Sequence, residues 1–207
     1  MLGIMRKDAP VYLLMAAFAV LGPTLDAVLH GLRGNSAVTT GGWTLFLVLP
    51  AVQCEIAEYL TRGYRFLRAM PLTAREIVWA KHVWPVVLVV GQQIYVALLF
   101  AAVAPRDVRL ASRGYSVLAG DLTLVVAAAL LFFIFRFGLS RGSMVALILA
   151  TVAGMVALQE VVIRHRLLQD IARFGSWPVL TGVTLVCLGL YALLATASAR
   201  AFERREV

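Results

Sequence analysis

Long apolar runs, each about the length of a membrane helix, alternate with short polar connectors along this chain. A transmembrane helix needs roughly 20 mostly apolar residues, and six runs meet that requirement. They cover residues 10–29, 42–60, 77–103, 115–135, 143–162 and 177–197. The pattern predicts an all-α integral membrane protein with six transmembrane helices, forming a single domain over residues 1–207 with a short interfacial helix at residues 1–9.

The longest polar connector, Glu58–Lys81, separates the second run from the third, and we call it the elbow. Its first part places Leu60, Tyr64 and Leu67 at i, i+4 and i+7, with arginines on the opposite side. This spacing predicts an amphipathic helix. Pro71 ends that helix, because proline has no N–H to donate and disfavours a helical residue before it.

A capping box follows the proline. Thr73 and Glu76 have the S/T-x-x-E spacing directly before an apolar run, so Thr73 is the expected N-cap of the third span. Pro71, Thr73, Arg75 and Glu76 then form a stiff joint at the membrane surface, able to transmit motion from a docked partner. On composition alone, the elbow is more simply a basic surface helix that binds lipid head groups.

Composition and charge place this chain in a bilayer. Of its 207 residues 61% are hydrophobic and 14% are charged, whereas about 25% are charged in a soluble domain. The net charge of +8 does not indicate nucleic acid, because the cations lie in connectors where anionic lipids account for them. The first run is too long for a signal-peptide core and is expected to be retained as a span.

The basic residues also predict an orientation. Twelve of the 19 lysines and arginines fall in segments on one side of the six spans and seven on the other. Since cytoplasmic loops carry the excess of positive charge, both termini and the elbow are predicted to be cytoplasmic. The expected location is the bacterial inner membrane.

Motifs for chemistry within this chain are missing. There is no P-loop, no H-E-x-x-H, no G-x-S-x-G and no Cys/His cluster at metal-ligand spacing, so we expect no catalytic residue, metal or cofactor here. Cys54 and Cys187 lie inside apolar runs and are expected to be small core residues. His30, His82 and His165 lie near three different span ends and are expected at the membrane interface.

Several polar side chains fall inside or beside the spans. Ionisable groups in a bilayer raise the question of a proton or ion site, but these acids lie near span ends, where they are expected to reach water. They are Asp26, Glu55, Glu58, Asp121 and Glu160. Gln92 and Gln93 lie mid-run instead, which favours a hydrogen bond between helices, with a contact to transported substrate as the alternative.

Three pieces of the chain resemble the ABC-2-type transporter permeases, six-span subunits that pair with a separate ATPase. Ile4-Met-Arg-Lys-Asp8 is similar to their I-R-K-D-L start. Ala69-Met-Pro-Leu-Thr-Ala-Arg-Glu-Ile77, preceded by Glu58 and followed by Lys81, resembles their L-P-[IVL]-S/T-R-x-E-I stretch. Phe135-Arg-Phe-Gly-Leu-Ser-Arg-Gly142 looks like a turn of one subfamily. The chain departs from the pattern at Met70, where leucine is frequent, and at Ala74, where arginine is common.

The resemblance implies a function in transport. The first part of the elbow would be a coupling helix seated in a groove of the ATPase, with aromatic and leucine anchors and with arginines facing an acidic rim. The residues concerned are Glu58, Arg62, Tyr64, Arg65, Phe66, Leu67 and Arg68. ATP and Mg would bind in that partner, and a second copy or a related permease would complete the pathway for export of an amphipathic or hydrophobic peptide, lipid or drug.

The resemblance also implies an outer gate formed by the segment with Arg166, Asp170 and Arg173, for which a plain surface loop is the alternative.

Three other classes of protein stay open on the sequence. These are an intramembrane hydrolase or lipid transferase, the substrate-binding subunit of an energy-coupling-factor transporter, and a membrane anchor or assembly factor. An enzyme would need convergent catalytic groups at one depth, and the sequence offers only scattered ones.

Overall fold

The computed structural model describes residues 2–30, 44, 46–60, 71–103, 106–138, 153 and 177–204. Within these residues the chain forms five α-helices and one short 3-10 helix, with no strand. The elements are α1 (Leu2–His30), η1 (Phe46–Val48), α3 (Leu49–Leu60), α5 (Ala74–Val103), α6 (Arg106–Phe137) and α9 (Trp177–Glu203). The predicted all-α class is confirmed for this part of the chain.

Four of the helices are long and apolar enough to cross a membrane. The segments are Arg6–Leu25, Ala74–Ala102, Ser116–Phe137 and Pro178–Glu203. Large apolar side chains on them point outward, among them Phe18 and Leu21 on α1 and Leu193 on α9. Soluble proteins rarely expose so much contiguous apolar surface. These helices indicate a multi-pass membrane protein.

Two of the six predicted spans are not among these four. The span expected at 42–60 corresponds to η1 and the short helix α3. The span expected at 143–162 lies outside the described residues, apart from residue 153. The number of six spans and the membrane side that each end faces therefore stay predictions.

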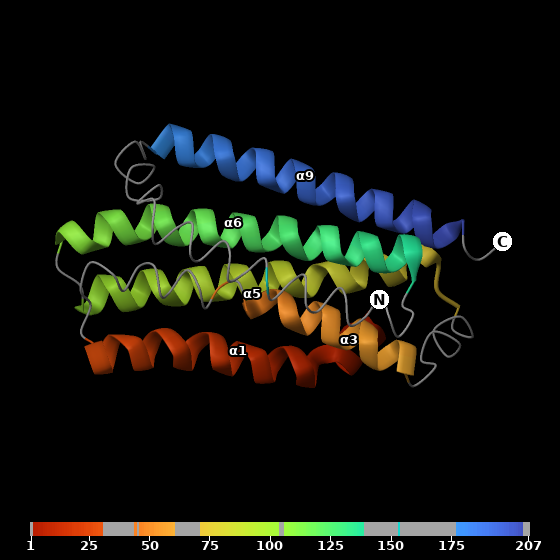
Figure 1. The fold of residues 1–207 in the computed structure, drawn as a ribbon, viewed down its shortest axis with the longest axis horizontal. Helices are drawn as coiled ribbons and strands as arrows, with labels where there is room; N and C mark the ends of the chain where they lie inside the picture. The colour runs from red at the N-terminus through yellow and green to blue at the C-terminus, as the bar shows by residue number, and fades with distance from the viewer. Residues whose placement is uncertain are drawn as a thin grey trace.

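The long helices lie side by side (Figure 1). Helix α6 packs most extensively on α9, and α5 packs on α1, α6 and α9. One end of the bundle holds the N-terminal ends of α1 and α5 together with the C-terminal ends of α3, α6 and α9 (Figure 1). We call this the elbow end, because the chain leaves α3 and enters α5 there.

Helix α1 is continuous from Leu2 to His30 although it contains Pro10 and Pro23. The sequence predicts a separate interfacial helix at residues 1–9, so two expected elements are one. An interior proline removes a hydrogen bond and usually bends or breaks a helix. Contacts with α5 hold this part of α1 in place, since Tyr12 stacks on Trp84 with ring centroids 5.0 Å apart.

Helix α6 begins at Arg106, well before the span predicted to start at residue 115. The difference has a simple reason. The apolar-length criterion finds only the part of a helix that matches the hydrocarbon thickness, whereas arginine and other polar residues in the first turns are compatible with a helix that continues beyond it.

The hydrogen bonds of the predicted capping box are present at the start of α5. The Thr73 backbone N–H donates to Glu76 Oε2 at 2.9 Å, and the Glu76 N–H donates to Thr73 Oγ1 at 3.2 Å. The Ile77 N–H donates to the Thr73 carbonyl at 3.1 Å, which makes Thr73 the N-cap. The cap fixes where the elbow becomes membrane helix.

Replacing Thr73 by alanine is expected to lower the free energy of unfolding by about 1 kcal/mol, because the Glu76 N–H loses its side-chain acceptor. Thr73→Ser is the control, since serine keeps the hydroxyl and caps equally well. Unfolding in detergent micelles, followed by circular dichroism, measures both. Equal midpoints for the alanine and serine variants would contradict the role of the cap.

An apolar core fixes the elbow end of the bundle. Ile77 and Val78 of α5, Leu131 and Phe135 of α6, and Phe202 of α9 are buried together. The rings of Phe135 and Phe202 meet edge to face with centroids 5.3 Å apart, a favourable aromatic geometry. This core holds α5, α6 and α9 in register where the elbow enters α5.

Candidate functional site

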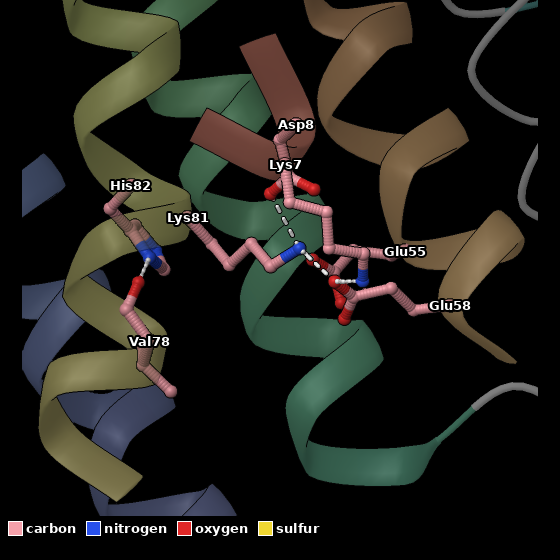
Figure 2. Close-up of polar contacts among 7 residues, drawn as sticks. All are labelled: Lys7, Asp8, Glu55, Glu58, Val78, Lys81 and His82. Carbon is pink, nitrogen blue, oxygen red and sulfur yellow. Dashed lines mark hydrogen bonds and ion pairs between the residues drawn. The ribbon is translucent and has the colours of Figure 1, made fainter. Parts of the chain in front are cut away.

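A buried cluster of charged side chains lies at the elbow end, beside the apolar core. Three helices supply it: Lys7 and Asp8 come from α1, Glu55 and Glu58 from α3, and Lys81 from α5 (Figure 2). Glu55 and Glu58 are three residues apart, a spacing that puts two side chains on the same helix face. Figure 2 shows the Lys81 side chain extending away from α5 toward the carboxylates.

Lys81 is the centre of this ion cluster. Its Nζ donates to Asp8 Oδ2 at 2.7 Å and to Glu58 Oε1 at 2.6 Å, and it lies 3.4 Å from Glu55 Oε1. Lys7 Nζ donates to the same Glu58 oxygen at 2.8 Å. The side chains of Lys81, Glu55 and Glu58 are 1%, 0% and 2% exposed, whereas Lys7 is 43% exposed.

Burial makes the partners in this cluster depend on one another. Removing an ammonium or carboxylate group from water costs several kcal/mol, and only close opposite charges and hydrogen bonds offset that cost. Lys81 has three donors and is surrounded by three carboxylates. The cluster therefore ties α1, α3 and α5 together through an interaction in which each charge needs the others.

The cluster also joins the two ends of the elbow. Glu58 is the first residue of the elbow and Lys81 is its last, and their side chains form an ion pair at 2.6 Å. The intervening residues 61–70 lie outside the described residues. Through Lys81, α5 is joined to α3 at Glu58 and to α1 at Asp8. Among the described residues no group of three or more His, Cys, Asp or Glu side chains is arranged to hold a metal ion.

His82 faces the other way and joins α5 to α9. Its Nδ1 donates to the Val78 carbonyl oxygen at 2.9 Å (Figure 2). Its own carbonyl accepts a hydrogen bond from the Tyr191 hydroxyl, and its ring meets Tyr191 edge to face with centroids 5.7 Å apart. His82 is only 1% exposed, so its ring is enclosed by the bundle. Its predicted depth at the membrane interface stays a prediction.

Polar side chains deeper in the bundle form further links between helices. The Ser116 hydroxyl of α6 donates to Gln93 Oε1 of α5 at 2.5 Å. Gln93 therefore makes a hydrogen bond between helices, as the sequence favours. Gln92 is also buried, and within the described residues neither of its side-chain polar atoms has a hydrogen-bond partner. Asp121 is expected to reach water, but it is buried and accepts a hydrogen bond from Thr184 of α9 at 2.8 Å.

Gly120 makes room for Gln93. A Cβ at position 120 would lie 2.7 Å from Gln93 Nε2 and 3.2 Å from Val89 Cγ1, so Gly120→Ala is expected to displace Gln93 from Ser116. Losing that bond costs about 1 kcal/mol. Gly91→Ala is the matched control, since within the described residues nothing beyond its own stretch of helix lies within 4 Å of the added carbon, and the change to alanine favours the helix. Unfolding midpoints in micelles should fall for Gly120→Ala alone; equal midpoints would contradict the steric interpretation.

Several predicted site residues are not described. The coupling-helix residues after Glu58 and the outer-gate residues fall in ranges 61–70 and 164–176, which lie outside the described residues. They are Arg62, Tyr64, Arg65, Phe66, Leu67, Arg68, Arg166, Asp170 and Arg173. Their roles stay predictions. Pro71, Arg75 and Glu76 are exposed at the elbow end, where a partner can reach them.

Sequence reasoning missed the ion cluster itself. Glu55 and Glu58 were expected to reach water, and they are buried because Lys81 and Lys7 supply their counter-charges. One signal was available, namely three acids and a lysine at the predicted cytoplasmic ends of three apolar runs.

Comparisons with family models, with curated proteins and with solved structures find no match for this chain.

Proposed function

We propose that this chain is the membrane-spanning subunit of an ATP-driven exporter of the ABC-2 type. One observation carries the proposal: residues from separate pieces of the resemblance converge at the elbow end. Asp8 of the first piece binds Lys81, which follows the second piece. Lys81 in turn binds Glu58, and Phe135 of the third piece packs in the core with Ile77 and Val78.

The arrangement suggests how force would pass into the membrane. A partner ATPase, which binds ATP and Mg, docks on the elbow and moves it when its two copies close. Because Glu58 and Lys81 join the two ends of the elbow and Asp8 adds α1, the three helices respond as one body. Rigid-body motion of packed helices about an interface is a common form of two-state switching.

The distribution of charge supports a cytoplasmic position for the elbow end. Basic side chains gather there, at the N-terminal ends of α1 and α5, in the last turns of α6 and α9, and directly after α9. They are Arg6, Lys7, Arg75, Arg136, Arg200 and Arg204. Positive charge favours the cytoplasmic side, where a soluble ATPase is available. A second copy or a related permease completes the pathway in the bacterial inner membrane, and the cargo is hydrophobic or amphipathic.

The ion cluster favours this function over an intramembrane enzyme. Its acids are buried and paired with lysines of neighbouring helices. Such pairs are suited to holding helices together. A general acid or base must instead reach a substrate proton.

Affinity purification from native membranes tests the proposal. The detergent-solubilised full chain is isolated, the copurifying proteins are identified by mass spectrometry, and ATP hydrolysis by the sample is measured. A P-loop ATPase at one copy per permease, with ATPase activity in the eluate, is the expected result. A chain that purifies without any ATPase from membranes in which it is functional would contradict the proposal and return the enzyme class to consideration.

A further inference from the structure

A groove of about 520 Å³ lies between the C-terminal parts of α6 and α9. Its lining has two parts. Arg136 of α6 and Arg200 and Arg204 of α9 supply three guanidinium groups, and Phe132, Leu190 and Leu193 supply apolar surface. The groove is separate from the ion cluster, which is built from α1, α3 and α5.

The two parts of the groove lie at different depths. The candidate membrane segments of α6 and α9 end at Phe137 and Glu203, so Arg136 and Arg200 lie in their last turns and Arg204 directly follows α9. Leu190 precedes Arg200 by ten residues, which places it about 15 Å further along the helix. The groove thus begins at head-group level with three cations and continues into the hydrocarbon along an apolar wall on which Leu190 and Leu193 are exposed.

The three arginines lack a counter-charge in the described part of the chain. No ion pair between described residues includes Arg136, Arg200 or Arg204. Arg200 and Arg204 are four residues apart on one helix, where like charges repel mildly. Glu203 lies on the same helix but does not line the groove. A bound anion would relieve the repulsion, and guanidinium groups bind phosphate oxygens in a bidentate manner.

We propose that this groove binds one anionic phospholipid. The phosphate and its head group lie among Arg136, Arg200 and Arg204, and an acyl chain follows Phe132, Leu190 and Leu193. Free phosphate would contact only the arginines, and an uncharged lipid would contact only the apolar wall. An anionic phospholipid has a phosphate for the arginines and an acyl chain for the apolar wall. The site does not depend on the transport function proposed above.

Native mass spectrometry of the full-length, detergent-purified chain tests the site. Phosphatidylglycerol and phosphatidylcholine are titrated separately and bound lipid is counted. Since each basic residue near an anionic surface contributes about 1 kcal/mol, phosphatidylglycerol should bind about fivefold more weakly to Arg200→Gln and about 100-fold more weakly to R136Q/R200Q/R204Q. Arg6→Gln is the matched control, because it removes one exposed cation at the same end but outside the groove. Since Arg6 does not contact the phosphate in the proposed site, its loss is expected to weaken binding less than the loss of Arg200.

A second variant separates the apolar wall from the arginines. Leu193→Trp fills the groove without changing its charge, and it should weaken phosphatidylglycerol binding while the unfolding midpoint stays at the wild-type value. Glycerol 3-phosphate and inorganic phosphate should fail to displace the bound lipid at equal concentration.

The inference would be overturned by any of three results: equal binding of phosphatidylcholine, equal loss of affinity in Arg6→Gln and Arg200→Gln, or displacement by glycerol 3-phosphate as efficient as displacement by the lipid.

Discussion

Replacing Lys81 by methionine is expected to lower the free energy of unfolding by about 3–5 kcal/mol, which is the usual cost of removing one partner from a buried ion pair. The substitution keeps the length of the side chain and deletes its charge. Asp8, Glu55 and Glu58 would then face one another in a site where Lys81 is 1% exposed, with the half-exposed Lys7 as the remaining lysine of the cluster among the described residues.

Lys7→Met is the matched control for this prediction. It removes a lysine from the same cluster, but one that is 43% exposed, and partly solvated pairs contribute about 1 kcal/mol or less. Unfolding by sodium dodecyl sulfate in mixed micelles ranks both variants against the wild type. Similar midpoints for Lys81→Met and Lys7→Met would show that the cluster does not hold α1, α3 and α5 together.

The double variant E58Q/K81M adds a sharper test of the same contact. Glu58 accepts the shorter of the two hydrogen bonds from Lys81, at 2.6 Å, so neutralising it lowers the repulsion among the three buried carboxylates that Lys81 no longer offsets. The double variant should therefore be more stable than Lys81→Met alone, with a coupling energy of about 1 kcal/mol or more, as found for residues in direct contact. Additive effects would mean that Glu58 and Lys81 do not interact.

Replacing Tyr64 by alanine is expected to abolish coupling to the ATPase while leaving the fold intact. In the proposed docking mode Tyr64 is an aromatic anchor, and truncating such an anchor costs about 2 kcal/mol or more of binding free energy. This corresponds to about a 30-fold loss of affinity at 1.4 kcal/mol per tenfold change. Arg65→Glu should have a similar effect, because it turns an attraction to an acidic rim into repulsion.

Recruitment of the ATPase to membranes and ATP-dependent transport measure the effect of the Tyr64 and Arg65 variants. Leu98→Ala is the control, since Leu98 lies on the exposed surface of the membrane segment of α5 and has no access to a cytoplasmic partner. Unfolding midpoints of all three variants check that the fold is kept. Wild-type recruitment by both Tyr64→Ala and Arg65→Glu would remove the elbow from the mechanism.

Features set by neighbouring residues were predictable from the sequence. The start of α5 follows from Pro71, Thr73 and Glu76, because a proline break and a capping box act within a few positions of one another. The four long apolar helices follow from composition, because the bilayer requires a minimum apolar length. Even there the helix ends differ, as α1 runs through Pro10 and α6 begins at Arg106.

The ion cluster could not be predicted in the same way. Lys81 binds Asp8, 73 positions earlier in the chain, and this pairing requires the packing register of α1 against α5, which no local pattern encodes. The same holds for the Gln93–Ser116 bond and for burial of His82 against α9. The sequence identifies acids and a lysine near span ends; only the packing of helices decides whether they face water or one another.

Photo-crosslinking at position 64 is the most direct test of the proposed function. A photoreactive phenylalanine analogue replaces Tyr64 in the full chain within native membranes, and the same analogue at Leu98 serves as the lipid-facing reference. Illumination is predicted to join the chain to a P-loop ATPase from position 64 and not from position 98. Adducts of position 64 with lipid alone, in membranes where the chain is functional, would contradict docking of an ATPase on the elbow and with it the proposed exporter.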